Sequence, residues 1–67
     1  MTKDQIIFRT AFYQAFEDHN YDLFRTITWW NAHGKYLYMN DRKTFDAFRS
    51  LNSKEVNQVI REILLPF

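Results

Sequence analysis

The segment TITWWNAHGKYLYMND, residues 26–41, decides the fold of this 67-residue chain. Two adjacent tryptophans precede the only glycine, and two tyrosines, a leucine and a methionine follow it. The first half is rich in β-branched and aromatic residues, which suit a pleated surface. The sequence NAHG, residues 31–34, is typical of a hairpin loop with glycine in the left-handed position. We therefore expect a β-hairpin over residues 23–39.

A helix is the competing interpretation of the same segment. Leu23, Ile27 and Trp30 also recur at helical spacing, and Gly34 is a plausible stop for that helix. A helix would, however, leave the aromatic residues 36–39 as an unpaired loop. The hairpin is therefore the favoured interpretation.

Helices are expected on both sides of this segment. Thr2 and Gln5 form a capping-box pattern ahead of apolar residues at helical spacing, which predicts a helix over residues 3–18. After the hairpin, an asparagine–aspartate pair is expected to cap a short helix over residues 41–51. Ser53 is the expected cap of a last helix over residues 54–64, which a proline near the end of the chain prevents from continuing.

The predicted fold class is α+β: a single small domain over residues 1–67, with an N-terminal helix, a β-hairpin and two C-terminal helices. An all-α four-helix miniprotein is the alternative. A chain this short buries only about 60% of the surface that its unfolded form exposes. Because it has no cysteine, disulfides cannot add stability, and dense packing or association with a partner must do so.

Alternation along the hairpin divides its side chains between two faces. Trp30, Leu37 and Met39 are expected to point inward, because the tyrosine hydroxyls of the other face prefer water or a hydrogen-bonding partner. The outward face would combine aromatic and basic side chains, as interface hot spots do. We expect it to bind another protein or a second copy of this chain. The predicted partner-binding residues are Arg25, Ile27, Trp29, Lys35, Tyr36 and Tyr38.

The centre of the chain is also basic. Residues 23–54 carry six basic and two acidic side chains, although the net charge of the whole chain is only +1. Basic side chains beside exposed aromatic ones are typical of single-strand binding, and residues 41–64 also weakly resemble a helix-turn-helix pattern. A small nucleic-acid-binding protein is therefore the alternative function. The residues predicted to contact nucleic acid in that case are Arg42, Lys43, Lys54 and Arg61.

No sequence pattern indicates catalysis, a metal or a cofactor. One glycine cannot form a phosphate-binding loop, and the acidic residues 17–22 match no metal-binding motif. His33 is expected to be an ordinary turn residue. There is no secretory signal and no apolar run of the ~20 residues that span a bilayer. We expect a non-enzymatic, cytoplasmic accessory or regulatory protein that blocks or modulates a larger protein by stoichiometric binding.

Overall fold

The computed structural model describes residues 1–67 and contains five helices and no strand. The helices are α1 (Lys3–Asp18), α2 (Leu23–Ala32), α3 (Gly34–Asn40), α4 (Arg42–Ser50) and α5 (Ser53–Leu64). They make up 81% of the chain, so the fold is all-α, and the predicted α+β class with its hairpin is wrong. None of the five helices combines the length and apolar composition that a membrane crossing requires.

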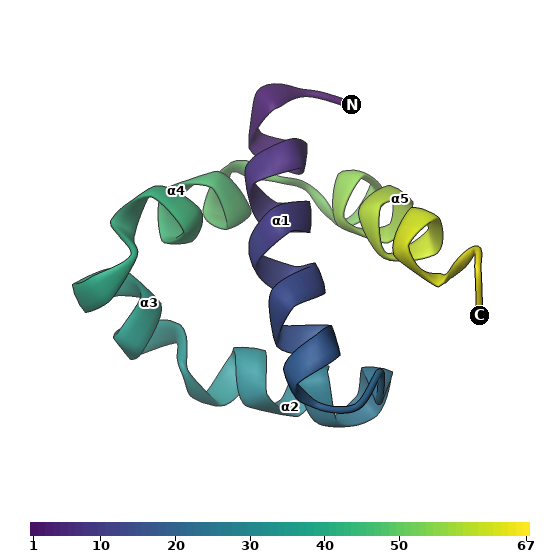
Figure 1. Cartoon of the computed structure of the whole chain (residues 1–67). Helices are drawn as coiled ribbons and strands as arrows, with labels where there is room; N and C mark the ends of the chain where they lie inside the picture. The colour runs from purple at the N-terminus through teal and green to yellow at the C-terminus, as the bar shows by residue number, and fades with distance from the viewer.

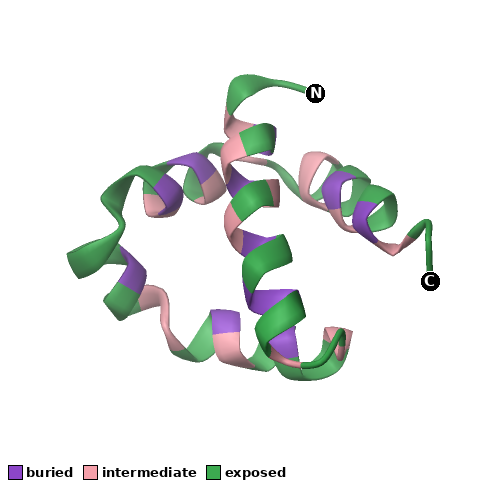
Figure 2. Ribbon diagram, in the orientation of Figure 1, coloured by how far each residue is buried: buried purple, intermediate pink, exposed green.

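The longest helix, α1, runs through the middle of the molecule, with α2, α3 and α4 following one side and α5 on the other (Figure 1). Helix α1 packs against α2, α4 and α5, and α3 packs against α2 and α4. Buried residues gather along α1 and on the helices beside it, whereas α3 is mostly exposed (Figure 2). The core is therefore organised around the first helix.

An aromatic cluster joins α1 to α2 and α4. The ring of Phe8 lies 5.3 Å from Phe12, 5.4 Å from Trp30 and 5.1 Å from Phe48, measured between centroids. Trp30 also meets Phe12 at 5.4 Å and Phe48 at 5.5 Å. Tilted and edge-on contacts of this kind stabilise a core beyond the area that they bury. Trp30 is the residue through which α2 enters this cluster.

A buried glutamine ties α1 to α5. Gln5, which is 3% exposed, donates from Nε2 to the Glu55 carbonyl oxygen (3.2 Å) and to Gln58 Oε1 (3.0 Å). Its own Oε1 accepts from the Thr2 backbone N–H (2.9 Å), which completes the expected capping box. Each polar atom of this buried side chain thus has a partner, as buried polar groups require.

The segment expected to be the first hairpin strand is helical because its polar groups support a helix. Asp22 caps α2 by accepting a hydrogen bond from the Arg25 N–H (3.0 Å). The hydroxyl of Thr26 donates to the Asp22 carbonyl (2.7 Å), and Thr28 donates to the carbonyl one turn before it (3.0 Å). Threonine can stabilise a helix in this way despite its β-branched side chain. One turn apart, Thr26 and Trp30 are both buried.

The segment expected to be the second strand is also helical, and Gly34 is not a turn residue with positive φ. Gly34 begins α3, and His33 ends α2 and precedes α3. The objection that a helix would strand residues 36–39 in a loop therefore fails, because these residues belong to a second short helix. The all-α alternative was closer, but it had four helices where the structure has five.

Helical periodicity also changes which side chains point inward. Trp30 and Leu37 are buried as expected, whereas Met39 is 69% exposed, so its predicted inward position is wrong. Residues two apart share a face of a strand but lie on different sides of a helix. Leu37 and Met39 therefore cannot both face the core.

The bounds of the other helices lie close to those expected. Asp41 caps α4, accepting from the Thr44 N–H (3.3 Å) and hydroxyl (2.8 Å). The last helix begins at Ser53, but its cap is Asn52, and the prediction of Ser53 as cap is wrong. Asn52 accepts from the Glu55 N–H (2.9 Å) while the Glu55 carboxylate accepts from the Asn52 N–H (3.1 Å). This reciprocal pair satisfies two donors, which a lone serine cannot do.

The turn from α1 to α2 uses two residues with left-handed backbone angles. Asn20 and Tyr21 have φ of 57° and 60°, which is uncommon for residues other than glycine. The ring of Tyr21 packs against Phe16 (5.5 Å) and Phe67 (5.3 Å), which holds the turn in place. The turn leads the chain from α1 into α2, which packs back against α1.

Candidate binding cleft

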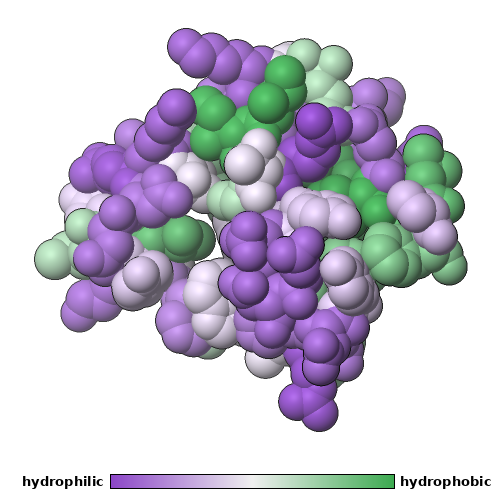
Figure 3. Space-filling view, in the orientation of Figure 1, coloured by the Kyte–Doolittle hydropathy of each residue, from purple (hydrophilic) through white to green (hydrophobic).

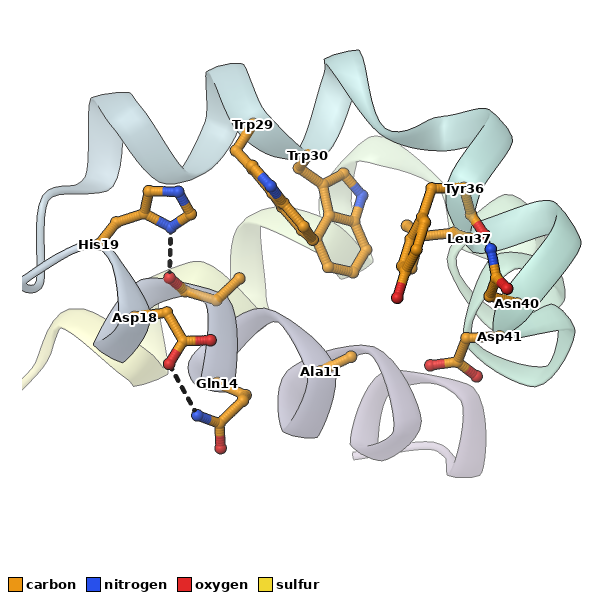
Figure 4. Close-up of a pocket in the computed structure, with 11 residues that line it drawn as sticks. Ala11, Gln14, Asp18, His19, Trp29, Trp30, Tyr36, Leu37, Asn40 and Asp41 are labelled. Carbon is orange, nitrogen blue, oxygen red and sulfur yellow. Dashed lines mark hydrogen bonds between the residues drawn. The ribbon is translucent and has the colours of Figure 1, made fainter.

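A cleft of about 530 Å³ lies between α1 on one side and α2 and α3 on the other (Figure 4). The space-filling view shows the surface hollowed beside the lower half of α1 (Figure 3). The volume of the cleft falls within the ~300–1,000 Å³ typical of ligand-binding pockets. We call this space the aromatic cleft. Its main lining residues are Gln14, Asp18, Trp29, Trp30, Tyr36 and Asp41.

Three aromatic side chains form one wall of the cleft. Trp29 and Trp30 extend from α2 toward α1, and Tyr36 extends from α3 with its hydroxyl directed toward α1 (Figure 4). They differ in exposure: Trp30 is 5% exposed, Trp29 is half-buried and Tyr36 is 55% exposed. The wall thus passes from the core at Trp30 to an open surface at Tyr36.

Two histidines hold the side chain of Trp29. The His33 ring stacks on it with centroids 4.6 Å apart and planes at 19°, and His19 lies 5.8 Å away on the α1 side. His33 Nδ1 is 2.8 Å from the Trp29 carbonyl oxygen. Figure 4 shows the other contact, in which His19 Nδ1 is 2.7 Å from the Ala15 carbonyl oxygen. Since a carbonyl only accepts, both Nδ1 atoms carry the proton and donate. These bonds fix both rings and thereby Trp29.

Two carboxylates lie at the two ends of the cleft (Figure 4). Asp18 accepts one hydrogen bond from Gln14 Nε2 (3.1 Å), and Asp41 accepts from Thr44 as the cap of α4. Neither forms a salt bridge, because the three ion pairs of the molecule use other acidic residues. No lysine or arginine lines the cleft. The cleft therefore combines an aromatic wall with unneutralised negative charge.

The structure brings together two of the residues predicted to bind a partner and separates a third from them. Trp29 and Tyr36, which were expected on the outward face of a hairpin, line the same cleft from two helices. Tyr38 instead lies where α3 meets α4, with its ring 5.1 Å from Phe45 and the Arg42 guanidinium 4.3 Å above it. Tyr36 and Tyr38, two residues apart on a helix, point in different directions.

The remaining predicted partner-binding residues lie on the outer surface. Arg25 is exposed, pairs with Asp22 (3.4 Å) and borders a second hollow beside the highly exposed Phe24. Ile27 on α2 and Lys35 on α3 are also exposed, and neither lines the aromatic cleft. They stay predictions of partner contact.

The basic residues considered for nucleic acid do not line one groove. Arg42 donates from Nε to Asp46 (3.0 Å), and this hydrogen bond raises the pKa of the guanidinium above its ordinary value. Lys43 is exposed on the same helix, whereas Lys54 and Arg61 are exposed on α5. Helices α4 and α5 each pack on α1 and stand on opposite sides of it (Figure 1). They do not form the adjacent helix pair of a helix-turn-helix.

The acidic members of the cleft were missed by sequence reasoning. Asp18 was considered only among the acidic residues 17–22, which match no metal-binding motif, and Asp41 only as a cap. A signal did exist on α1, where Ala11, Gln14 and Asp18 recur at spacings of three and four and so share a side of the helix. No group of three or more histidine, aspartate or glutamate side chains in the structure could hold a metal ion.

Comparisons with protein-family models, with curated proteins and with solved structures found no match to this chain. The composition and geometry of the aromatic cleft are therefore the basis for assigning a function.

Proposed function

We propose that this chain binds another protein through the aromatic cleft, and that it modulates or blocks that larger protein by stoichiometric occupancy. The exposure of the cleft wall is the observation that carries this proposal. Trp29 and Tyr36 present large apolar surface beside a concave space; Trp29 packs at the edge of the core cluster that includes Phe8, and Tyr36 lies outside that cluster. Aromatic side chains in such positions are the commonest hot spots of protein interfaces.

The arrangement of the wall favours binding at little entropic cost. Trp29 is already fixed by His33 and His19, and aromatic side chains have only two rotatable bonds. A partner that covers these rings gains ~25 cal/mol per Å² of apolar surface removed from water. It gains this without ordering a flexible surface, which is the usual advantage of aromatic binding sites.

The charge of the cleft supports a protein partner over nucleic acid. Asp18 and Asp41 stand at its ends, and no basic side chain lines it. Nucleic-acid affinity depends on lysines and arginines that replace counterions at phosphates. The exposed basic residues of α4 and α5 lie outside the cleft, so the positive charge of the molecule is not beside the aromatic wall. For a chain without disulfides we also propose the cytoplasm as the location.

Photo-crosslinking tests the proposal in cells that naturally produce the chain. A benzoylphenylalanine is placed at Tyr36 in the cleft or at Tyr13, an exposed aromatic residue of α1 outside it. We expect position 36 to link one protein reproducibly, with loss of the link in the Trp29→Ala background. Position 13 should not link the same segment. Links to nucleic acid alone, or equal links from both positions, would contradict the proposal.

The identified partner then allows a quantitative test. Calorimetry of the purified pair should give one partner molecule per chain, and Trp29→Ala should weaken the complex by ~2 kcal/mol, as hot-spot truncations do. The complex should also persist at about 0.5 M salt, where binding driven by phosphate contacts is largely lost. A complex that dissociates at this salt concentration, and whose affinity is unchanged by Trp29→Ala, would favour the nucleic-acid alternative.

A further inference from the structure

We infer that the segment bound in the aromatic cleft is basic, with one arginine or lysine side chain at the carboxylate of Asp18 and another at the carboxylate of Asp41, beside the aromatic wall. The inference rests on the proposed function and names the chemistry of the partner. The cleft itself is the site, and its uncompensated charge indicates what fills it.

The chain contains an internal example of the contact that we infer. The guanidinium of Arg42 lies 4.3 Å above the ring of Tyr38, and its Nε donates to the Asp46 carboxylate at 3.0 Å. One cation is thus shared between the face of a tyrosine and a nearby aspartate. Such stacking is favourable because the ring face is the negative end of the aromatic quadrupole.

The aromatic cleft repeats this arrangement without the cation. Tyr36 and Asp41 line it from the α3 end, as Tyr38 and Asp46 flank Arg42. The ring of Tyr36 is seen nearly edge-on in Figure 4, with one face turned toward the cleft and Trp30. A guanidinium placed there would meet an aromatic face and a carboxylate together. Arginine suits this position better than lysine because its planar group stacks and donates in a fork.

Both carboxylates have capacity to accept further hydrogen bonds. An ionised carboxylate offers about four acceptor positions. Asp18 uses one, for Gln14, and Asp41 uses two, for the N–H and hydroxyl of Thr44. Because neither has a cationic partner within the chain, an incoming cation displaces no existing ion pair.

The positions of the carboxylates indicate the shape of the bound segment. Asp18 and Asp41 stand at opposite ends of the cleft, with the tryptophans between them (Figure 4). Two basic side chains separated by an apolar one would meet both carboxylates and place the apolar group against the indoles. We therefore expect a short basic–apolar–basic segment of the partner.

Peptide titration of the full chain, followed by NMR, tests this inference. The probes are acetyl-Arg-Leu-Arg-amide and its neutral counterpart acetyl-Gln-Leu-Gln-amide. We expect the arginine peptide to shift the indole signals of Trp29 and Trp30 and the ring of Tyr36, with at least about tenfold tighter binding than the glutamine peptide, from two ion pairs and a cation–π contact. Added salt should lower the affinity of the arginine peptide, because it screens the ion pairs.

Charge-removing variants identify the contacts. Asp18→Asn can still accept from Gln14. Asp41→Asn keeps the cap, because its Oδ1 accepts from the Thr44 N–H while its Nδ2 donates to the Thr44 hydroxyl. Each should weaken arginine-peptide binding about two- to fivefold, the range expected for exposed ion pairs. Glu17→Gln is the matched control, because Glu17 neighbours Asp18, is exposed, forms no ion pair and does not line the cleft. It should change binding least.

The aromatic contribution is tested at Tyr36, which is exposed enough to replace without unfolding the chain. Tyr36→Phe keeps the ring face and should preserve arginine-peptide binding, whereas Tyr36→Leu keeps apolar volume without a ring and should weaken it. Circular dichroism of each variant confirms that the helices remain.

Each outcome decides between the inference and the proposed function. Equal binding of both peptides in the cleft would overturn the basic specificity and leave protein binding standing. Binding of the arginine peptide elsewhere, binding of neither peptide, or an equal effect of Glu17→Gln would also overturn the inference. Crosslinking from position 36 then still tests the proposed function independently, and the sequence of the linked segment shows directly whether it is basic.

Discussion

Two regions around α1 use similar side chains in opposite ways. Toward α4 and α5 the space is closed, with Phe8 and Phe12 in contact with aromatic and aliphatic partners and Gln5 fully hydrogen-bonded. Toward α2 and α3 the wall opens from Trp30 to Tyr36. An aromatic side chain in this small protein is therefore not always part of the core. Successive residues of a helix point about 100° apart, so a tryptophan pair is divided between core and cleft.

Trp30 and Trp29 give the largest expected difference between the two regions. Trp30→Ala removes the residue that joins α2 to the aromatic cluster and should cost ~3–5 kcal/mol of unfolding free energy. For a domain of this size that loss is enough to unfold much of the protein. Trp29→Ala should cost much less, because Trp29 is only half-buried. Urea denaturation followed by circular dichroism measures both, and equal losses would remove the distinction.

Gln5 tests how firmly the closed side is fixed. Gln5→Ala removes both hydrogen bonds to α5 and leaves the Glu55 carbonyl without this donor. We expect a loss of ~2 kcal/mol, within the range for buried polar groups that lose a partner. Gln58→Ala removes only one of the two acceptors and should cost less in the same denaturation experiment. If Gln5→Ala is neutral, the apolar contacts and the Arg9–Glu62 ion pair hold the two helices together without Gln5.

Asp41 tests the rim of the open side. Asp41→Ala removes the cap of α4 and should destabilise the fold by ~1 kcal/mol, whereas Asp41→Asn preserves the cap and should be nearly neutral. Thermal melting of both variants measures the difference. Similar losses for both would mean that the charge of Asp41, rather than its capping hydrogen bonds, stabilises α4.

Gly34 gives the smallest effect and separates the helical fold from the hairpin. Its φ is not positive, and an added Cβ would have no neighbour within 4 Å. Gly34→Ala should therefore stabilise the protein by ~0.5 kcal/mol, because alanine has fewer unfolded conformations to lose. A left-handed hairpin position would instead make alanine destabilising. A fall in melting temperature would contradict the start of α3 at Gly34.

Local signals predicted the outer helices. The Thr2–Gln5 box and the apolar spacing of residues 3–18 act within one helix, so they can be read without knowing the fold. The middle could not be predicted in this way. The strand preference of its β-branched and aromatic residues is overridden by the burial of Thr26 and Trp30, which depends on contacts with distant residues.

The candidate site was predictable only in part, for the same reason. Trp29 and Tyr36 stood out as aromatic residues beyond the needs of a small core. The two-residue alternation of a strand, however, placed Tyr38 on the same face as these two residues, which the helix does not. Asp18 and Asp41 lie far apart in sequence and line the same cleft only because α2 packs against α1 and α3 packs against α2 and α4. No spacing rule within a single helix relates two such residues.

Quenching of single tryptophans by acrylamide measures whether Trp30 is closed off in the core while Trp29 faces the open cleft. Trp30→Phe leaves Trp29 as the only indole, and Trp29→Phe leaves Trp30. Phenylalanine keeps an aromatic ring at each site, and circular dichroism of both variants checks that the helices remain. We expect the emission of Trp29 to be quenched more strongly than that of Trp30, and acetyl-Arg-Leu-Arg-amide to protect Trp29. Equal quenching of the two indoles, or stronger quenching of Trp30, would contradict a closed core beside an open aromatic cleft.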